Sequence, residues 1–276
     1  MSRLPIKPAV QRIVRQTAPL GVEIGNWAVK KAARPERLHI YLAHDVLAVC
    51  RISGYGKRSV RSKTILTPDA GATDLPALLA TLDTWLDAHP VHGDIDWIVG
   101  VQHVRYLLLP WDTRLANDAF CRSLTAALFA QHFPGGIPFT DYQLRFAPLA
   151  FGQPRLAALI ANDIIHALTV FSRQRGSRVR RIAPALSVVW DHFHVRIKKR
   201  TGVLGLIEGP RLLRIGYDHG HITTFSIQPF SGTRSMATQS ETTWLFPADP
   251  AGDAPAFEHL APGDDPRLAY ALCGVA

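Results

Sequence analysis

From about residue 38 onward, the chain consists of short apolar runs separated by turn residues. The runs at 38–43 and 46–52 flank a tight turn and predict a β-hairpin, and the run at 58–66 alternates charged and apolar side chains as a half-exposed strand does. Leucines recur at helical spacing over 75–88, and a strand follows at 95–101. This opening therefore predicts three meandering strands, a crossover helix and a fourth strand.

The middle of the chain continues to alternate predicted strands and helices, and a second three-strand meander at 202–227 repeats the opening pattern. The repetition suggests two related halves. Residues 231–267 are rich in Ser, Thr, Gly, Pro and Asp, so the helix and closing strand expected for the second half are not recognisable. The predicted middle elements are strands at 103–109, 142–147, 155–160 and 179–182 and helices at 113–132, 162–174 (with Asn162 as N-cap) and 185–195.

The composition is that of a globular protein. The chain has 276 residues, of which 47% are hydrophobic and 19% charged, enough for one large domain or two small ones. No apolar run reaches the roughly 18 residues of a membrane-spanning helix, and the start of the chain lacks a secretory pattern. The three widely spaced cysteines fit a reduced compartment. We therefore expect a cytoplasmic protein.

The positive charge is concentrated at the start of the chain. The formal net charge is +9, and residues 1–34 hold seven basic residues and one acid, which leaves about a third of the excess for the body. Within this basic arm (residues 1–36), residues 5–16 predict a short amphipathic helix with Arg12 and Arg15 on its polar face. Either the arm is a solvated tail or it contacts acidic lipid or an acidic partner. The nearly balanced body does not favour nucleic-acid binding.

Several segments resemble the PilM/GspL-like group of actin-fold proteins, which are cytoplasmic components of bacterial type IV pilus and type II secretion assembly. They are the hairpin at 38–52, the block at 97–111 and the meander at 202–227, and residues 103–111 carry the motif Val-Arg-Tyr followed by Pro-Trp. The resemblance covers about 37–230. It implies an α/β actin-like, RNase H-like body of two β-β-β-α-β lobes, the second one truncated, with the irregular tail 231–276 outside it.

The resemblance also implies a two-lobed scaffold that binds a short peptide from an inner-membrane partner, with nucleotide binding kept in some members and lost in others. An actin-like ATPase grips phosphate with two hairpin turns rich in Gly and Ser or Thr. The first turn here, Ala43-His44-Asp45, has neither glycine nor hydroxyl. In the second, Glu208 and Gly209 precede Pro210, which has no N–H to donate. These turns therefore predict vestigial phosphate loops, with neither an ATP–Mg²⁺ cofactor nor catalytic residues.

A metal site, a nuclease site and a second kind of phosphate hairpin have less support in the sequence. The histidine pairs at 192/194 and 219/221 lack the further ligands that a metal site requires. A metal-dependent nuclease would need an acid inside the first strand, which has none, and Asp94 and Asp96 are expected to be loop and cap residues. An atypical phosphate hairpin at 20–30 would revive the alternative of an actin-fold ATPase or small-molecule kinase.

The function expected from the sequence is a non-catalytic cytoplasmic scaffold or adaptor of a pilus- or secretion-type envelope assembly. Its partner would be a cytoplasmic segment of an inner-membrane component. Peripheral membrane contact and a homodimer remain open. Residues expected to contact a partner or lipid are Arg173, Arg175, Arg178, Arg180, Arg181, Lys198, Lys199, Arg12 and Arg15.

Overall fold

The computed structural model describes residues 36–54, 59–68, 73–91, 93–230, 242–247, 260–273 and 275, all of which belong to one compact unit that begins at Arg34. The helix predicted at 5–16, with Arg12 and Arg15, and the alternative hairpin at 20–30 lie outside the described residues. None of the described helices is both long and apolar enough to cross a bilayer.

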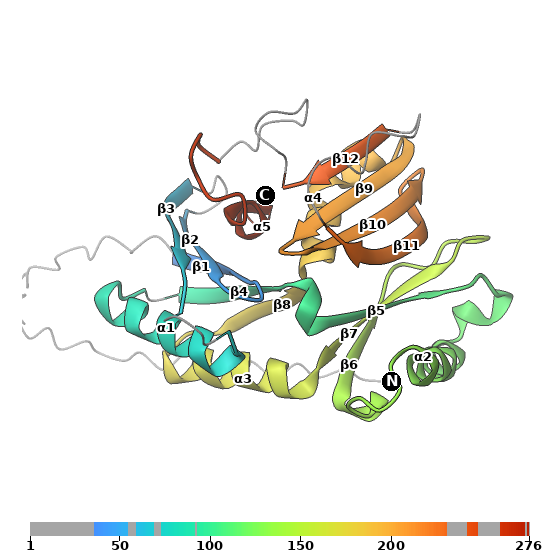
Figure 1. The fold of residues 1–276 in the computed structure, drawn as a ribbon, viewed down its shortest axis with the longest axis horizontal. Helices are drawn as coiled ribbons and strands as arrows, with labels where there is room; N and C mark the ends of the chain where they lie inside the picture. Colours follow the sequence, from blue (N-terminus) through green and yellow to red (C-terminus); the bar gives the residue numbers. More distant parts are fainter. Residues whose placement is uncertain are drawn as a thin grey trace, which may run out of the picture. The chain divides into compact units, whose positions relative to one another are not determined.

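The first sheet has five strands in the order β3-β2-β1-β4-β8 (Figure 1). The first three form the predicted antiparallel meander, while β4 and β8 run parallel to β1. This confirms the opening of the predicted fold. The strands are β1 (Glu36–Leu42), β2 (Leu47–Ser53), β3 (Ser59–Leu66), β4 (Gly93–Val99) and β8 (Val179–Pro184).

Helices cover both faces of this sheet (Figure 1). On one face, α1 (Leu75–Ala88) and α3 (Asn162–Gln174) lie side by side, and Trp97 of β4 donates its Nε1–H to Ser172 of α3 at 3.0 Å. On the other face lie α4 (Ala185–Ile197) and α5 (Leu268–Cys273). Successive residues of a strand point to opposite faces of the sheet. Because helices cover both faces, the inner strands are apolar almost throughout.

A smaller three-stranded sheet, in the order β5-β7-β6, is inserted between β4 and α3 and has its own core with α2. The single helix predicted at 113–132 is in fact interrupted at Asn117. The side chain of Asn117 caps α2 by accepting from Ala119 N at 2.8 Å, so the chain turns there. The elements are η1 (Val101–His103), β5 (Val104–Leu109), η2 (Thr113–Ala116), α2 (Asp118–His132), η3 (Phe139–Asp141), β6 (Tyr142–Phe146) and β7 (Arg155–Ala161).

The second sheet repeats the beginning of the first. Its order is β11-β10-β9-β12, with three antiparallel strands followed by one strand parallel to β9. Among the described residues no strand corresponds to β8, in agreement with a truncated second half. The strands are β9 (Thr201–Glu208), β10 (Arg211–Asp218), β11 (His221–Pro229) and β12 (Thr242–Phe246).

Three local predictions were wrong. The tail 231–276 is not irregular throughout, because β12 extends the second sheet and all six residues of α5 are buried. Asn162 does not cap α3, since Ala161 occupies the N-cap position and the Asn162 side chain donates its Nδ2–H to Thr140 O at 3.5 Å. Asp94 and Asp96 lie inside β4 rather than in a loop, and Asp96 is fully buried.

Candidate functional site

The two predicted turns lie at one place in the molecule. The first turn follows β1 and the second follows β9, and a hydrogen bond of 2.8 Å joins Tyr41 Oη of β1 to Glu208 Oε2 at the end of β9. Gly100, which follows β4, lies next to both: its N–H donates to Leu42 O at 2.9 Å, and a Cβ at this position would lie 2.8 Å from Glu208 Oε2. The chain therefore brings together the two turns that an actin-like enzyme would use to hold phosphate.

The carboxylate of Glu208 occupies the middle of this junction. The residue is 5% exposed, and its Oε2 accepts both the Tyr41 hydroxyl and the N–H of Val101, the latter at 2.7 Å. Its Oε1 has no hydrogen-bond partner within the described residues. Burial raises the pKa of Glu208 to about 7, although both hydrogen bonds and the charge of Arg211 act in the opposite direction.

Gly100 is required for this arrangement. A Cβ at this position would lie 2.8 Å from Glu208 Oε2 and 2.8 Å from Leu42 O, closer than such atoms approach. The absent side chain lets the carboxylate reach the Val101 N–H. Glycine here serves the approach of a side chain from the second sheet, in the way that phosphate-binding turns use glycine for the approach of a ligand.

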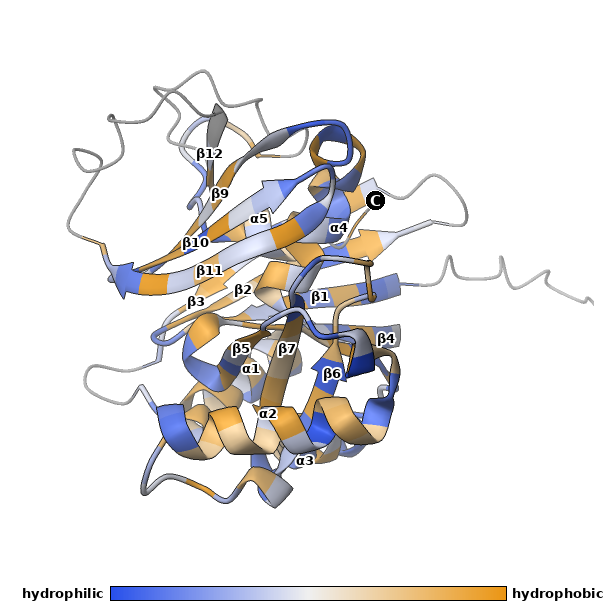
Figure 2. Cartoon of the chain, turned by 90° about the vertical axis from the view of Figure 1, so that its right-hand side faces the viewer, coloured by the Kyte–Doolittle hydropathy of each residue, from blue (hydrophilic) through white to orange (hydrophobic). Residues whose placement is uncertain are grey.

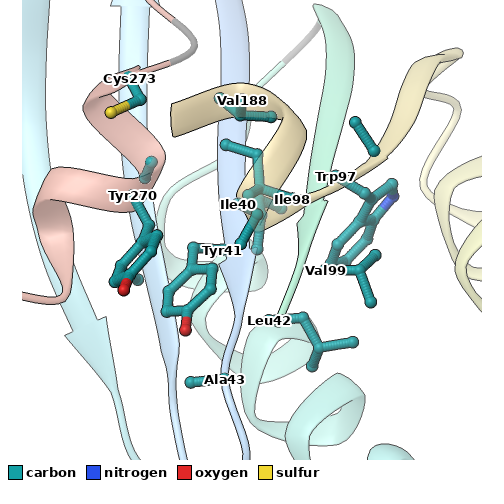
Figure 3. Packing of buried hydrophobic residues seen from close by; sticks show 14 of the residues in the cluster. Ile40, Tyr41, Leu42, Ala43, Trp97, Ile98, Val99, Val188, Tyr270 and Cys273 are labelled. Carbon is teal, nitrogen blue, oxygen red and sulfur yellow. The ribbon is translucent and has the colours of Figure 1, made fainter. Parts of the chain in front are cut away.

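Two stacked tyrosines form one wall of the junction (Figure 3). The rings of Tyr41 and Tyr270 of α5 lie 4.4 Å apart, and the Tyr270 hydroxyl donates to Ile207 O at 2.8 Å. Burial, and then the nearby Glu208, hold the pKa of Tyr41 well above its usual value, so its hydroxyl stays a donor. The first sheet and α5 are thus both tied to the last residues of β9.

In the first turn, the carboxylate forms an ion pair instead. Its only carboxylate, Asp45, lies 3.3 Å from Arg267 Nη1, and Arg267 also pairs with Asp265 at 2.7 Å. Beside the turn, burial lowers the pKa of His103 to about 4, against the effect of its hydrogen bond to the Ala43 backbone. The acid that could hold a magnesium ion is therefore paired with a guanidinium group.

No protein-family model matches the chain, and no curated protein matches it. Among solved structures, the PilM–PilN type IV pilus biogenesis complex aligns with a TM-score of 0.52 at 13% identity, over 71% of this chain and 62% of that chain. This chain has an actin-like fold. The cytoplasmic domain of EpsL, an inner-membrane component of the type II secretion system of Vibrio cholerae, gives 0.49 at 11% identity, over 70% and 71% of the two chains. A Bacteroides thetaiotaomicron protein with an actin-like ATPase fold gives 0.47 at 9% identity, over 72% of each chain.

The resemblance to PilM/GspL-like proteins is thereby confirmed as a likeness of fold. In this actin-like fold, the repeated strand order of the two sheets explains why the turns after β1 and β9 meet. The structure places all five predicted turn residues at or beside this junction: Ala43, His44, Asp45, Glu208 and Gly209.

Of the seven predicted basic contact residues that the structure describes, four are paired with acids of the same chain. Arg173, Lys198 and Lys199 are exposed. Contact of these residues with a partner or with lipid stays a prediction. The pairs are Arg175 with Asp83 and Asp87, Arg178 with Asp94 at 3.0 Å, and Arg180 and Arg181 with Asp96 at 3.2 and 3.9 Å.

Sequence reasoning missed a row of polar residues across the first sheet, two of which, His39 and Asp96, are buried. His39, Asp96 and Arg181 lie opposite one another on β1, β4 and β8, and His39 Nε2 is 3.2 Å from Asp96 Oδ2. Burial alone would raise the pKa of Asp96, but its contacts with His39 and the two arginines outweigh this and lower it. The available signal was a histidine and an acid within two apolar runs of neighbouring parallel strands.

Proposed function

We propose that the protein is a non-catalytic adaptor of a pilus- or secretion-type envelope assembly, and that it binds a segment of a partner protein. The observation that carries the proposal is the Glu208 carboxylate, which takes the Tyr41 hydroxyl and the Val101 N–H at the junction of the two turns. These are the kinds of donor that a bound phosphate would use. A buried carboxylate in the same place also repels another anion.

The fold supports the assignment to an assembly. The solved structure that shares it at a TM-score of 0.52 is a complex of two pilus biogenesis proteins. In such an adaptor, the actin-like body would serve as a stable framework, and its surface would carry the specificity. The partner would be a cytoplasmic segment of an inner-membrane component.

Nucleotide binding gives the first test. A ligand that binds only the folded state raises the melting temperature, and a ligand at 100 times its dissociation constant contributes about 2.7 kcal/mol. We expect millimolar ATP with Mg²⁺ to leave the melting temperature of the full chain unchanged. A rise of several degrees, lost on addition of EDTA, would instead favour an ATPase or kinase.

Partner capture gives the second test. The full chain, purified from its native host under mild conditions, should retain a protein of the inner-membrane assembly machinery that mass spectrometry identifies. The matched control is a purification with an unrelated protein of similar basic charge. Recovery of only nucleotides or RNA would contradict the adaptor.

A further inference from the structure

The border strand of the second sheet, β11, presents a regular free edge. Within the described residues, no strand pairs with its outer side. Phe230 N donates to Pro210 O at 2.8 Å, and this bond fixes which residues of β11 hydrogen-bond to β10 between Pro229 and the register shift at Gly216. The residues of β11 that bond to β10 are therefore the even-numbered ones, Thr224, Ser226 and Gln228, in register with Gly216, Arg214 and Leu212.

Between the register shift and Pro229, the odd-numbered residues of β11 point their main-chain groups outward. In an antiparallel ladder, residues between the hydrogen-bonded pairs direct their N–H and C=O away from the partner strand. Phe225 and Ile227 thus offer two N–H and two C=O groups at the free edge. The window ends at Pro229, which has no N–H, and at a register shift opposite Gly216 and Tyr217. It is long enough for an extended segment of about five residues.

The side chains of β11 do not protect this edge. Soluble proteins shield border strands with charges, and four of the other five border strands carry them: Arg61 and Lys63 on β3, Arg180 and Arg181 on β8, Arg105 on β5 and Arg145 on β6. The fifth, β12 at the opposite border of the same sheet, has no charged residue but is only five residues long. Residues 221–229 contain neither Lys, Arg, Asp nor Glu. In Figure 2, β11 runs along the border of its sheet and is pale or orange along most of its length.

The two faces of the edge differ in chemistry. Ile227 is 43% exposed and shares its face with Phe225, whose ring lies 5.2 Å from that of Tyr106. The opposite face carries Ser226, beside Arg214 of β10. Among the described residues, Arg214 has no carboxylate within ion-pair distance. Its side chain is partly exposed, and its neighbour toward the free edge, Ser226, is exposed and short.

We infer that β11 binds an extended segment of a partner protein by strand addition, and that this segment alternates acidic and apolar residues. The acidic side chains face Arg214, and the apolar ones lie against Ile227 and Phe225. Main-chain hydrogen bonds at the edge supply the affinity, and the two faces supply the register. This inference rests on the proposed adaptor function and names the surface that performs it.

Amide hydrogen exchange on the full chain tests the geometry directly. The probe is a capped hexapeptide of alternating Glu and Val, and the control is the same peptide with Lys in place of Glu. We expect the Glu–Val peptide to slow exchange of the Phe225 and Ile227 amides at least about tenfold. The Ser226 and Gln228 amides, already bonded to β10, should change little. Equal protection of all four amides, or equal effects of both peptides, would overturn the inference.

Two variants at one position separate the main-chain contribution from the side chain. Ile227→Pro removes an outward N–H and leaves the bonds to β10 in place, so the peptide should bind about tenfold more weakly. Ile227→Thr keeps the N–H and should bind within about threefold of wild type. Thermal unfolding checks that both variants are folded, and if Ile227→Pro is not, the exchange pattern still decides.

The remaining outcomes distinguish this inference from the adaptor proposal. Arg214→Gln should weaken binding about threefold and reduce its salt dependence. A concentration-dependent dimer that Ile227→Pro abolishes would identify a second copy of this chain as the occupant and overturn the inference. Stabilisation by ATP would contradict the adaptor and leave the edge untouched, whereas a failed peptide test without a nucleotide effect would contradict the edge alone.

Discussion

The two hairpin turns hold equivalent places in two related sheets, yet their carboxylates differ in exposure and in bonding partners. Asp45 follows β1, is 53% exposed at its side chain and pairs with Arg267. Glu208 is the last residue of β9, is 5% exposed and accepts hydrogen bonds from the Tyr41 hydroxyl of β1 and from the N–H of Val101, just after β4. Ion pairs in solvent contribute little to stability, whereas a buried carboxylate with buried donors contributes or costs several kcal/mol. The second turn is therefore expected to contribute more to the free energy of unfolding than the first.

Removing the Glu208 side chain should have the largest effect. Glu208→Ala leaves the Tyr41 hydroxyl and the Val101 N–H buried without an acceptor, each at a cost of about 1–3 kcal/mol. We expect a loss of roughly 4 kcal/mol in the free energy of unfolding, measured by urea denaturation at pH 6. The matched control is Glu208→Gln, which keeps an acceptor oxygen and should lose much less. Equal losses in the two variants would contradict this account of the junction.

The pH dependence of stability isolates the charge of Glu208. The pKa of Glu208 is raised from its usual 4.5 to about 7 in the folded state, so the folded state holds the proton more tightly than the unfolded state. The stabilisation is therefore fully present below pH 4.5 and is lost as the pH rises through 7. At 1.36 kcal/mol per pKa unit, the loss is about 3 kcal/mol.

The measurement is the difference in unfolding free energy between wild type and Glu208→Gln from pH 4 to pH 8. Taking the difference removes the contribution of carboxylates such as Asp96, whose lowered pKa acts in the opposite direction. The difference should fall with rising pH and level off above 7. A difference that does not change with pH would show that folding does not raise the pKa of Glu208.

Gly100 tests the packing around Glu208 from the side of the first sheet. A Cβ there would meet Glu208 Oε2 and the Leu42 carbonyl oxygen, each at 2.8 Å, and the latter belongs to the backbone of the first sheet. We expect Gly100→Ala to cost about 2 kcal/mol, as overpacked sites do. In the Glu208→Gln background the cost should persist, because the backbone contact remains. Gly136, with its nearest such contact at 3.6 Å, provides a control position, where alanine should cost little.

The sequence predicted the meanders and both turns because strand periodicity and turn residues are local signals. It placed Glu208 and Asp45 at the right turns, but burial depends on what the other sheet supplies. The Val101 N–H and the Tyr41 hydroxyl come from residues 107 and 167 positions away from Glu208. Neither the strand β12 nor the helix α5 was predicted, because each depends on packing against parts of the chain that are distant in sequence, β9 and the first sheet.

Asp45 provides the smallest effect and the control for the whole comparison. Its partner Arg267 already pairs with Asp265, and more than half of the Asp45 side chain is exposed. We expect Asp45→Ala to change the free energy of unfolding by less than about 0.5 kcal/mol, and 1 M salt to remove even that difference. Urea denaturation at low and high salt is the measurement. A loss comparable to that of Glu208→Ala would mean that the two turns share the structural role, and that the distinction between an exposed and a buried carboxylate does not govern this junction.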